Sequence, residues 1–235
     1  MKTFTFLKDV LVPKKCYFCQ KEWHFYCPKC SERIKKIPPI CYVCKEKSDG
    51  FKIHTDCRQY LDTQSLMLLF PYQKIKKLIK DSKYYRRKDI LEELWVYTSK
   101  FLLNTLSIKN KDEFIIIPIP MNFWRKSKRW YNHSDILAKH VSISSGIRYN
   151  TKILKRVKNT LQQSKLTRSE RLSNLDWAFK VNEKYRDILK WKKVILIDDV
   201  VSTGVTFLEV IAVMQDIDTQ SIDCIAIASD TAFFD

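Results

Sequence analysis

The sequence predicts an α/β fold, in which helices cover both faces of a parallel sheet and a small metal-binding module precedes it. Two observations carry this prediction. Continuously apolar segments alternate with segments of helical periodicity, which is typical of strands that are buried on both faces. Seven of the eight cysteines lie ahead of these segments, between Cys16 and Cys57. The 235 residues suffice for a module at residues 1–62 and one larger domain at residues 63–235.

The N-terminal module contains four pairs of candidate metal ligands. The motifs CYFC, CPKC, CYVC and HTDC supply Cys16, Cys19, Cys27, Cys30, Cys41, Cys44, His54 and Cys57. Two pairs complete one closed tetrahedral zinc site, so the module can bind one or two structural zinc ions. Sequence order leaves the pairing open, and a surface role for His54 leaves a single four-cysteine site as an alternative. The paired spacing favours metal binding in a reducing compartment over disulfides or redox chemistry.

Other residues of the same kinds are expected to pack in the interior. Cys224 lies in the apolar run IDCIAIA and is expected in the core. Trp23, Phe25 and Tyr26 are expected to pack on the metal-binding module, with stacking on nucleic-acid bases as an alternative.

The remaining elements follow in order along the chain. An apolar strand at residues 65–70 precedes a basic helix in QKIKKLIKDSKYYRR. The next helix, in KDILEELWVYTSKFLLNTL, has an apolar face formed by Ile90, Leu94, Tyr97 and Phe101. After the strand DEFIIIPIP, the helix in NHSDILAKHVSIS turns four side chains to the core: Ile136, Leu137, His140 and Val141. The strand KKVILID, the helix TGVTFLEVIAVMQDI and the strand SIDCIAIAS complete the pattern.

The charge is unevenly distributed. The formal net charge is +17, and residues 121–171 contain 13 basic and 2 acidic residues. Residues 172–235 contain 6 basic and 11 acidic residues, so a lysine-rich composition alone explains the basic segment poorly. Aromatic residues are interleaved with the basic ones in FWRKSKRWY, a pattern that favours single-stranded nucleic acid. The sequence has no run of 18 apolar residues and no signal-peptide core, so we expect a cytoplasmic protein.

The segment VILIDDVVSTGVTF contains the strongest candidate site. Asp198 and Asp199 follow an apolar strand, and in parallel sheets ligands bind at the carboxyl ends of strands. Carboxylate oxygens accept hydrogen bonds from vicinal hydroxyls, as in a ribose. The backbone N–H groups of the loop and of the helix start that follow suit a phosphate, and Gly204 allows close backbone approach. The segment matches neither a Walker A motif nor a dinucleotide fingerprint, so a ribose 5-phosphate is the simplest ligand.

This segment closely resembles the phosphoribosyl pyrophosphate (PRPP) motif of type I phosphoribosyltransferases. Two further segments resemble the ComF family of late competence proteins. The first is PIPMNFWRKSKRWYN, with Pro118, Pro120, Arg125, Arg129, Tyr131 and Asn132. The second matches at Thr160, Gln163, Leu166, Glu170, Arg171, Asn174 and Phe179. Trp130 and His133 stand where the family usually has glycine and glutamine.

The resemblance implies a type I phosphoribosyltransferase-like domain behind a zinc-ribbon module. It implies a pyrophosphate loop at residues 118–122, a hood at about residues 156–179, and Mg²⁺ bound together with PRPP. The implied PRPP-binding residues are Pro120, Met121, Arg125, Arg129, Asp198, Asp199, Val200, Val201, Ser202, Thr203, Gly204, Val205 and Thr206.

The resemblance also implies a function. We expect a competence protein that binds PRPP and handles incoming single-stranded DNA in the cytoplasm, at or near the inner membrane. Its expected partners are PRPP, single-stranded DNA and the competence helicase or membrane DNA channel. An active phosphoribosyltransferase with an unidentified acceptor base and a PRPP-sensing adaptor are the alternatives, because fold alone does not decide among them.

Overall fold

A four-stranded parallel sheet forms the centre of the computed structural model, which describes residues 13–84, 87–106, 108–121, 131–158 and 178–230. The strands lie in the order β1 (Ser65–Pro71), β6 (Ser221–Ser229), β5 (Lys193–Val201) and β2 (Phe114–Pro118). All three neighbouring pairs are parallel. Each of the four strands overlaps one predicted segment, and the predicted fold class is confirmed. Strand β5 runs three residues beyond the predicted segment KKVILID, so Val201 lies in the strand and not in the predicted loop.

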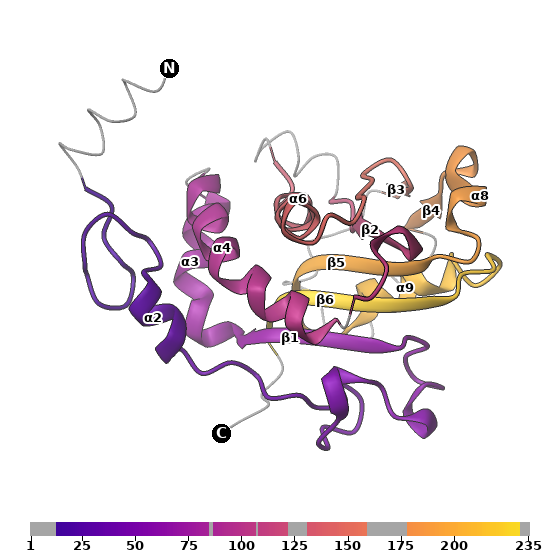
Figure 1. The fold of residues 1–235 in the computed structure, drawn as a ribbon, viewed down its shortest axis with the longest axis horizontal. Coiled ribbons are helices and arrows are strands. Elements are labelled where there is room, and N and C mark those ends of the chain that lie inside the picture. The colour runs from indigo at the N-terminus through magenta and orange to yellow at the C-terminus, as the bar shows by residue number, and fades with distance from the viewer. Residues whose placement is uncertain (1–12, 85–86, 107, 122–130, 159–177, 231–235) are drawn as a thin grey trace.

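Helices cover both faces of this sheet (Figure 1). On one face, α3 (Tyr72–Tyr84) and α4 (Lys88–Thr105) connect β1 to β2, and α6 (His133–Ser145) follows β2 and packs on α4. On the other face, α9 (Val205–Ala212) connects β5 to β6. After β2 the chain continues away from β1, to a segment in which Tyr149 forms a parallel bridge with Ile116. From β5 to β6 it runs in the opposite direction, towards β1. Because crossovers between parallel strands are right-handed, connections that run in opposite directions lie on opposite faces of the sheet.

The apolar strands form the core. Val194, Ile195, Leu196 and Ile197 of β5 are all fully buried, as a strand between two helical layers requires. Cys224 is also fully buried on β6, which confirms its predicted core position. On α6, the prediction holds for Leu137 and Val141, which are buried. Ile136 is partly buried and packs against the core, as predicted. His140 is only half-buried, and His133, Ser134 and Ala138 are buried on the same helix.

A small antiparallel pair lies beside the main sheet and was not predicted. It joins β3 (Leu154–Arg156) to β4 (Phe179–Val181), the two ends of the predicted hood. Three-residue strands leave no periodicity to read, which explains why the sequence did not indicate them. Residues 159–177 of the hood lie outside the described residues. Short helices follow at η5 (Glu183–Tyr185) and α8 (Arg186–Leu189), and η3 (Lys111–Glu113) precedes β2.

The cysteine-rich module precedes β1 and packs against the sheet and its helices. It contains α2 (Pro28–Arg33), η1 (Asp49–Phe51) and η2 (Thr55–Cys57). Phe25 and Tyr26 are buried as expected, but the expectation for Trp23 is wrong, because its side chain is 57% exposed. Trp23 has a positive φ of 73° and directly follows the bridge between Lys15 and Glu22 that closes a hairpin. The predicted boundary between residues 62 and 63 stays a prediction.

Among the described residues, no helix is both long enough and apolar enough to cross a bilayer.

Candidate functional site

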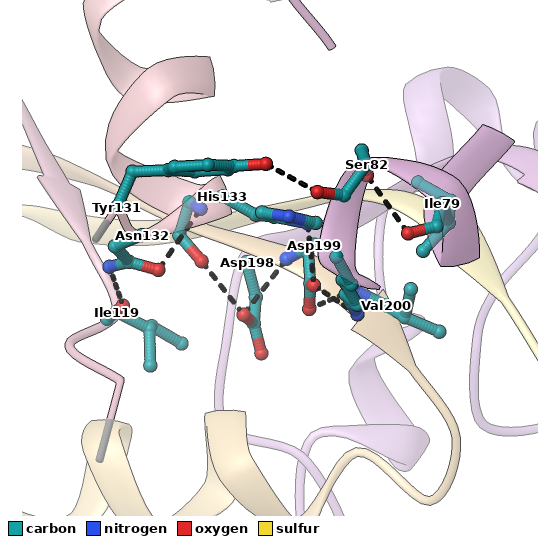
Figure 2. Close-up of polar contacts among 11 residues, drawn as sticks. Ile79, Ser82, Ile119, Tyr131, Asn132, His133, Asp198, Asp199 and Val200 are labelled. Atoms are coloured by element: carbon teal, nitrogen blue, oxygen red, sulfur yellow. Dashed lines mark hydrogen bonds and ion pairs between the residues drawn. The ribbon is translucent and has the colours of Figure 1, made fainter. Parts of the chain in front are cut away.

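The acidic pair lies at the carboxyl end of β5, one of the two central strands (Figure 2). Strand β5 continues through both acids to Val201, so Asp198 and Asp199 are held by sheet pairing rather than by a free loop. The start of α6 and the end of α3 meet at the same edge of the sheet, where they supply partners for both carboxylates. The pair is therefore a fixed feature of the fold.

Asp198 is held through one of its two oxygens. Its Oδ1 accepts hydrogen bonds from Ser134 Oγ at 3.0 Å and from the backbone N–H of Asp199 at 2.8 Å. Its Oδ2 has no hydrogen bond to any residue that the structure describes, and in Figure 2 it points away from these donors. Burial, followed by the neighbouring charge of Asp199, raises the pKa of Asp198 to about 7.

Asp199 lies between two basic side chains. Its Oδ2 is 2.5 Å from Lys83 Nζ and 3.3 Å from His133 Nδ1, and its Oδ1 accepts from the backbone N–H of Val200 at 2.8 Å. Burial opposes ionisation, but Lys83 and His133 outweigh it and hold the pKa of Asp199 well below its usual range. Asp199 is thus ionised at neutral pH, and Asp198 titrates near neutral pH.

Residues 131–134 are fixed by contacts with three elements. The Tyr131 ring stacks on the His133 ring with centroids 5.6 Å apart, and its hydroxyl donates to the Ser82 carbonyl on α3. Asn132 caps α6 by accepting from the backbone N–H of Ser134, and its Nδ2 donates to the Ile119 carbonyl at 2.9 Å. The sequence therefore places the start of α6 directly beside the acids.

The predicted pyrophosphate turn begins next to this site. The backbone N–H of Ile119 donates to the Ile197 carbonyl at 2.8 Å, so the residue before Pro120 lies beside the residue before Asp198. Pro120 and Met121 are half-buried there. Arg125 and Arg129 lie outside the described residues, as do most of the predicted hood residues.

The loop after β5 leads into α9 through Gly204. This residue has a φ of +78°, in the left-handed region that glycine adopts without a steric penalty, and it is the N-cap of α9. Ser202 and Thr203 are half-buried, as is Thr206 in the first turn of the helix. The first N–H groups of α9 have no partner within the helix, so this end suits an anion.

Sequence reasoning missed three residues of the site. Lys83, His133 and Ser134 all contact the acids, but Lys83 precedes Asp199 by more than a hundred residues. The sequence signal for the other two was their place in the first turn of a helix capped by Asn132. His133 was considered only as a departure from the family pattern, whereas the structure shows it 4% exposed and beside Asp199.

The eight candidate metal ligands form two groups of four. Within each group the ligand atoms lie within 4.8 Å of one another: Cys16, Cys19, Cys27 and Cys30 in the first, Cys41, Cys44, His54 and Cys57 in the second. Consecutive pairs therefore join, which resolves the pairing that the sequence left open. His54 lies among the ligands of the second group, so the alternative of an unrelated surface histidine is not supported.

The donor sets fit tetrahedral zinc. A zinc ion with Zn–S bonds of about 2.3 Å holds its sulfurs roughly 3.8 Å apart. Cys19 Sγ and Cys27 Sγ are 3.6 Å apart, and Cys44 Sγ and His54 Nδ1 are 3.3 Å apart. Burial raises the pKa of the Cys16 thiol, but hydrogen bonds from backbone N–H groups outweigh it and lower the pKa to about 7. The same kinds of cause lower the pKa of Cys41 to about 7, whereas burial raises the pKa values of Cys27, Cys30 and Cys57. The ligand distances within each group thus suit a structural metal ion.

Two hairpins present the first cysteine pair of each group in the same way. The antiparallel bridges Lys15–Glu22 and Ile40–Lys47 close them, and a positive φ follows the second cysteine in each, at Gln20 and Lys45. We call the segments Cys16–Gln20 and Cys41–Lys45 the first and second knuckle. Each has a tyrosine after its first cysteine.

Comparisons with known proteins show that most of the chain is similar to competence and DNA utilization proteins. No family model matches the sequence. Competence protein F of Haemophilus influenzae is 25% identical over 222 residues, covering 88% of this chain and 93% of that protein. DNA utilization protein YhgH of Escherichia coli K12 is 25% identical, covering 85% and 89%. YhgH of Salmonella typhi is 23% identical with the same coverage.

Among solved structures, TT1426 from Thermus thermophilus aligns with 62% of this chain and 85% of its own, at 11% identity and a TM-score of 0.35. That likeness is too low to support an argument. The sequence relatives cover 88% and 85% of this chain. The chain is therefore similar over most of its length to competence protein F and to the YhgH proteins, and the ComF-family resemblance of its motifs is confirmed.

Proposed function

We propose that this protein acts in DNA uptake during natural transformation and binds PRPP with Mg²⁺ at the edge of its sheet. The observation that carries the proposal is the position of Asp198 and Asp199. They lie at the end of β5, three residues before the half-buried loop that opens α9 through Gly204. Acceptors for a sugar and donors for a phosphate thus follow one another along a short, fixed stretch of chain.

The acidic pair supports the ribose assignment. Asp198 Oδ2 is available to accept from a hydroxyl, while Oδ1 is held by Ser134 and by the backbone. Asp199 is kept ionised by Lys83 and His133, so it supplies negative charge near the same hydroxyls. Hydrogen bonds to charged acceptors contribute about 1.5–3 kcal/mol each.

The loop and the turn after β2 support the phosphate assignments. The N–H groups at the start of α9, with the hydroxyls of Ser202, Thr203 and Thr206, suit the 5-phosphate. The turn at Pro120 and Met121 lies on the other side of the acids, where a pyrophosphate is expected. Mg²⁺ binds mainly through substrate phosphates, and it would supply positive charge to the pyrophosphate of bound PRPP. Arg125 and Arg129 follow in the sequence as candidate phosphate ligands.

The DNA role rests on the relatives and on charge. Relatives similar over most of the chain are named for competence and for DNA utilization. Residues 121–171, with 13 basic and 2 acidic residues, are the proposed contact with single-stranded DNA. The protein meets that strand on the cytoplasmic side of the inner membrane, near the helicase or the membrane channel.

One experiment separates the proposal from an active transferase. The purified protein is incubated with PRPP, Mg²⁺ and a panel of purine and pyrimidine bases, and pyrophosphate release is followed together with PRPP binding. Saturable PRPP binding without base-dependent release is the expected result. Base-dependent release identifies a working phosphoribosyltransferase, and absence of PRPP binding contradicts the proposal.

A further inference from the structure

The second knuckle reaches the loop that follows the acidic pair. Tyr42 Oη donates to the Ser202 carbonyl at 3.3 Å, although the two residues are separated by 160 positions in the sequence. A Cβ atom built on Gly204 lies only 3.1 Å from Tyr42 Cε1, so the ring lies directly against the Gly204 backbone. One side chain therefore contacts both ends of the segment Ser202–Gly204.

The position of the Tyr42 ring is set by the metal-binding hairpin. Tyr42 lies between the ligands Cys41 and Cys44. The backbone N–H of Lys45 donates to the Cys41 carbonyl at 2.9 Å, which closes the knuckle. Lys45 Nζ lies 4.1 Å from the centroid of the Tyr42 ring, on the side chain's own hairpin. A metal ion bound by Cys41 and Cys44 therefore restrains the ring that touches the loop.

The two knuckles contact different walls of the site. Tyr17, which occupies the same place in the first knuckle, donates to Asp81 Oδ2 at 2.8 Å. Asp81 lies on α3, two residues before Lys83, the partner of Asp199. Tyr17 does not contact the loop after β5, so the two tyrosines provide a natural comparison.

We propose that Tyr42 is a positioning residue for the loop Ser202–Gly204 and couples the second metal group to that loop. The ring packs against Gly204 in its left-handed conformation, and the hydroxyl restrains the Ser202 carbonyl. Thermodynamic coupling is reciprocal, so a ligand that orders the loop also tightens metal binding by the second group. The identity of that ligand, PRPP, rests on the proposed function, whereas the ordering of the loop does not.

The direct test is hydrogen exchange of the backbone amides of residues 202–206, followed by mass spectrometry in the zinc-loaded, ligand-free protein. In Tyr42→Ala, exchange is expected to accelerate about tenfold or more, because the loop loses its packing partner. Tyr42→Phe keeps the ring and is expected to restore most of the protection. Tyr60→Ala is the matched control: Tyr60 lines the same cavity of about 440 Å³ but is 65% exposed.

The zinc content of Tyr42→Ala decides which variant is used for the hydrogen-exchange comparison. If Tyr42→Ala retains two zinc ions per chain, its exchange is compared directly with that of the wild type. If it loses zinc, Tyr42→Leu, which keeps apolar volume in the knuckle, takes its place. Unchanged exchange of residues 202–206 in the zinc-loaded variant, or an equal effect of Tyr60→Ala, overturns the proposal.

A second measurement tests the coupling through the ligand. The rate of zinc transfer to a chromogenic chelator is measured with and without PRPP and Mg²⁺. PRPP is expected to slow release from the second group, and the slowing is expected to disappear in Tyr42→Ala and persist in Tyr17→Ala. If PRPP binds to the wild type but slows release equally in Tyr42→Ala, the coupling is wrong. If PRPP does not bind at all, the proposed function fails, and the exchange result alone decides the role of Tyr42.

Discussion

Replacing Asp198 with asparagine is expected to weaken ligand binding and to stabilise the fold. The substitution is nearly isosteric, and the amide oxygen can still accept from Ser134 Oγ and from the backbone N–H of Asp199. It removes the negative charge at Oδ2, where the ribose hydroxyl is proposed to bind. Loss of one charge-assisted hydrogen bond weakens PRPP binding about ten- to a hundredfold.

The stability gain follows from the raised pKa of Asp198. When a carboxyl has a higher pKa in the folded state than in the unfolded state, the protein loses folding stability as the pH rises from the unfolded-state pKa to the folded-state pKa. For Asp198 that window runs from 3.8 to about 7. A pKa shift of this size corresponds to a loss of folding stability of at most about 4 kcal/mol, and contact of Asp198 with solvent reduces that loss. We therefore expect Asp198→Asn to be more stable than the wild type by at least about 1 kcal/mol at pH 8.

Thermal unfolding at two pH values measures this gain. For a chain of this length, each kcal/mol raises the melting temperature by about 2–4 °C. Asp198→Asn is expected to melt higher than the wild type at pH 8, with a smaller difference at pH 5 and none near pH 3. Ser134→Ala serves as the control, because it removes a partner of Asp198 while leaving the charge. A melting temperature that is unchanged or lower at pH 8 refutes the assigned burial of this charge.

Three further outcomes are expected. Elemental analysis should find two zinc ions per chain. The variant Cys44→Ser should lose one of them, and the variant Cys224→Ser should keep both. A single zinc ion in the wild type contradicts metal binding by the second group. PRPP affinity should rise between pH 6 and pH 8, because ionisation of Asp198, with its pKa of about 7, completes the acceptor pair. This rise should be weaker in Asp198→Asn, and an equal rise in both proteins excludes Asp198 as its cause. Binding to single-stranded DNA should fall with salt with a log–log slope of about −0.7 per phosphate neutralised. Neutral substitutions of four basic residues should flatten that slope: Arg125, Lys126, Lys128 and Arg129. If binding does not depend on salt, the basic segment is not the contact with DNA.

The strands and the acidic pair could be predicted because their signals are local. Four continuously apolar runs each became a fully covered strand, since only burial on both faces suits such a run. Asp198 and Asp199 lie near the carboxyl end of β5, as predicted, although the strand continues past both acids to Val201. These features depend on neighbours in the sequence.

The partners of the acids could not be predicted, because they depend on how distant elements meet. Lys83 reaches Asp199 only because α3 ends where β5 ends. The joining of the metal pairs likewise depends on how the module folds into two hairpins, since the spacing permits other pairings. The expectation for Trp23 is wrong because it rests on hydrophobicity, whereas Trp23 is 57% exposed in the structure.

Isothermal calorimetry with PRPP and Mg²⁺ tests the central claim most directly. The wild type is compared with the double variant Asp198→Asn/Asp199→Asn, whose zinc content and melting temperature are checked first. Saturable binding to the wild type and a loss of at least about a hundredfold in the variant are the predicted results, since two charge-assisted hydrogen bonds are removed. Equal affinity in the two proteins, or no heat of binding in the wild type, contradicts the assignment of this site to a phosphoribosyl ligand.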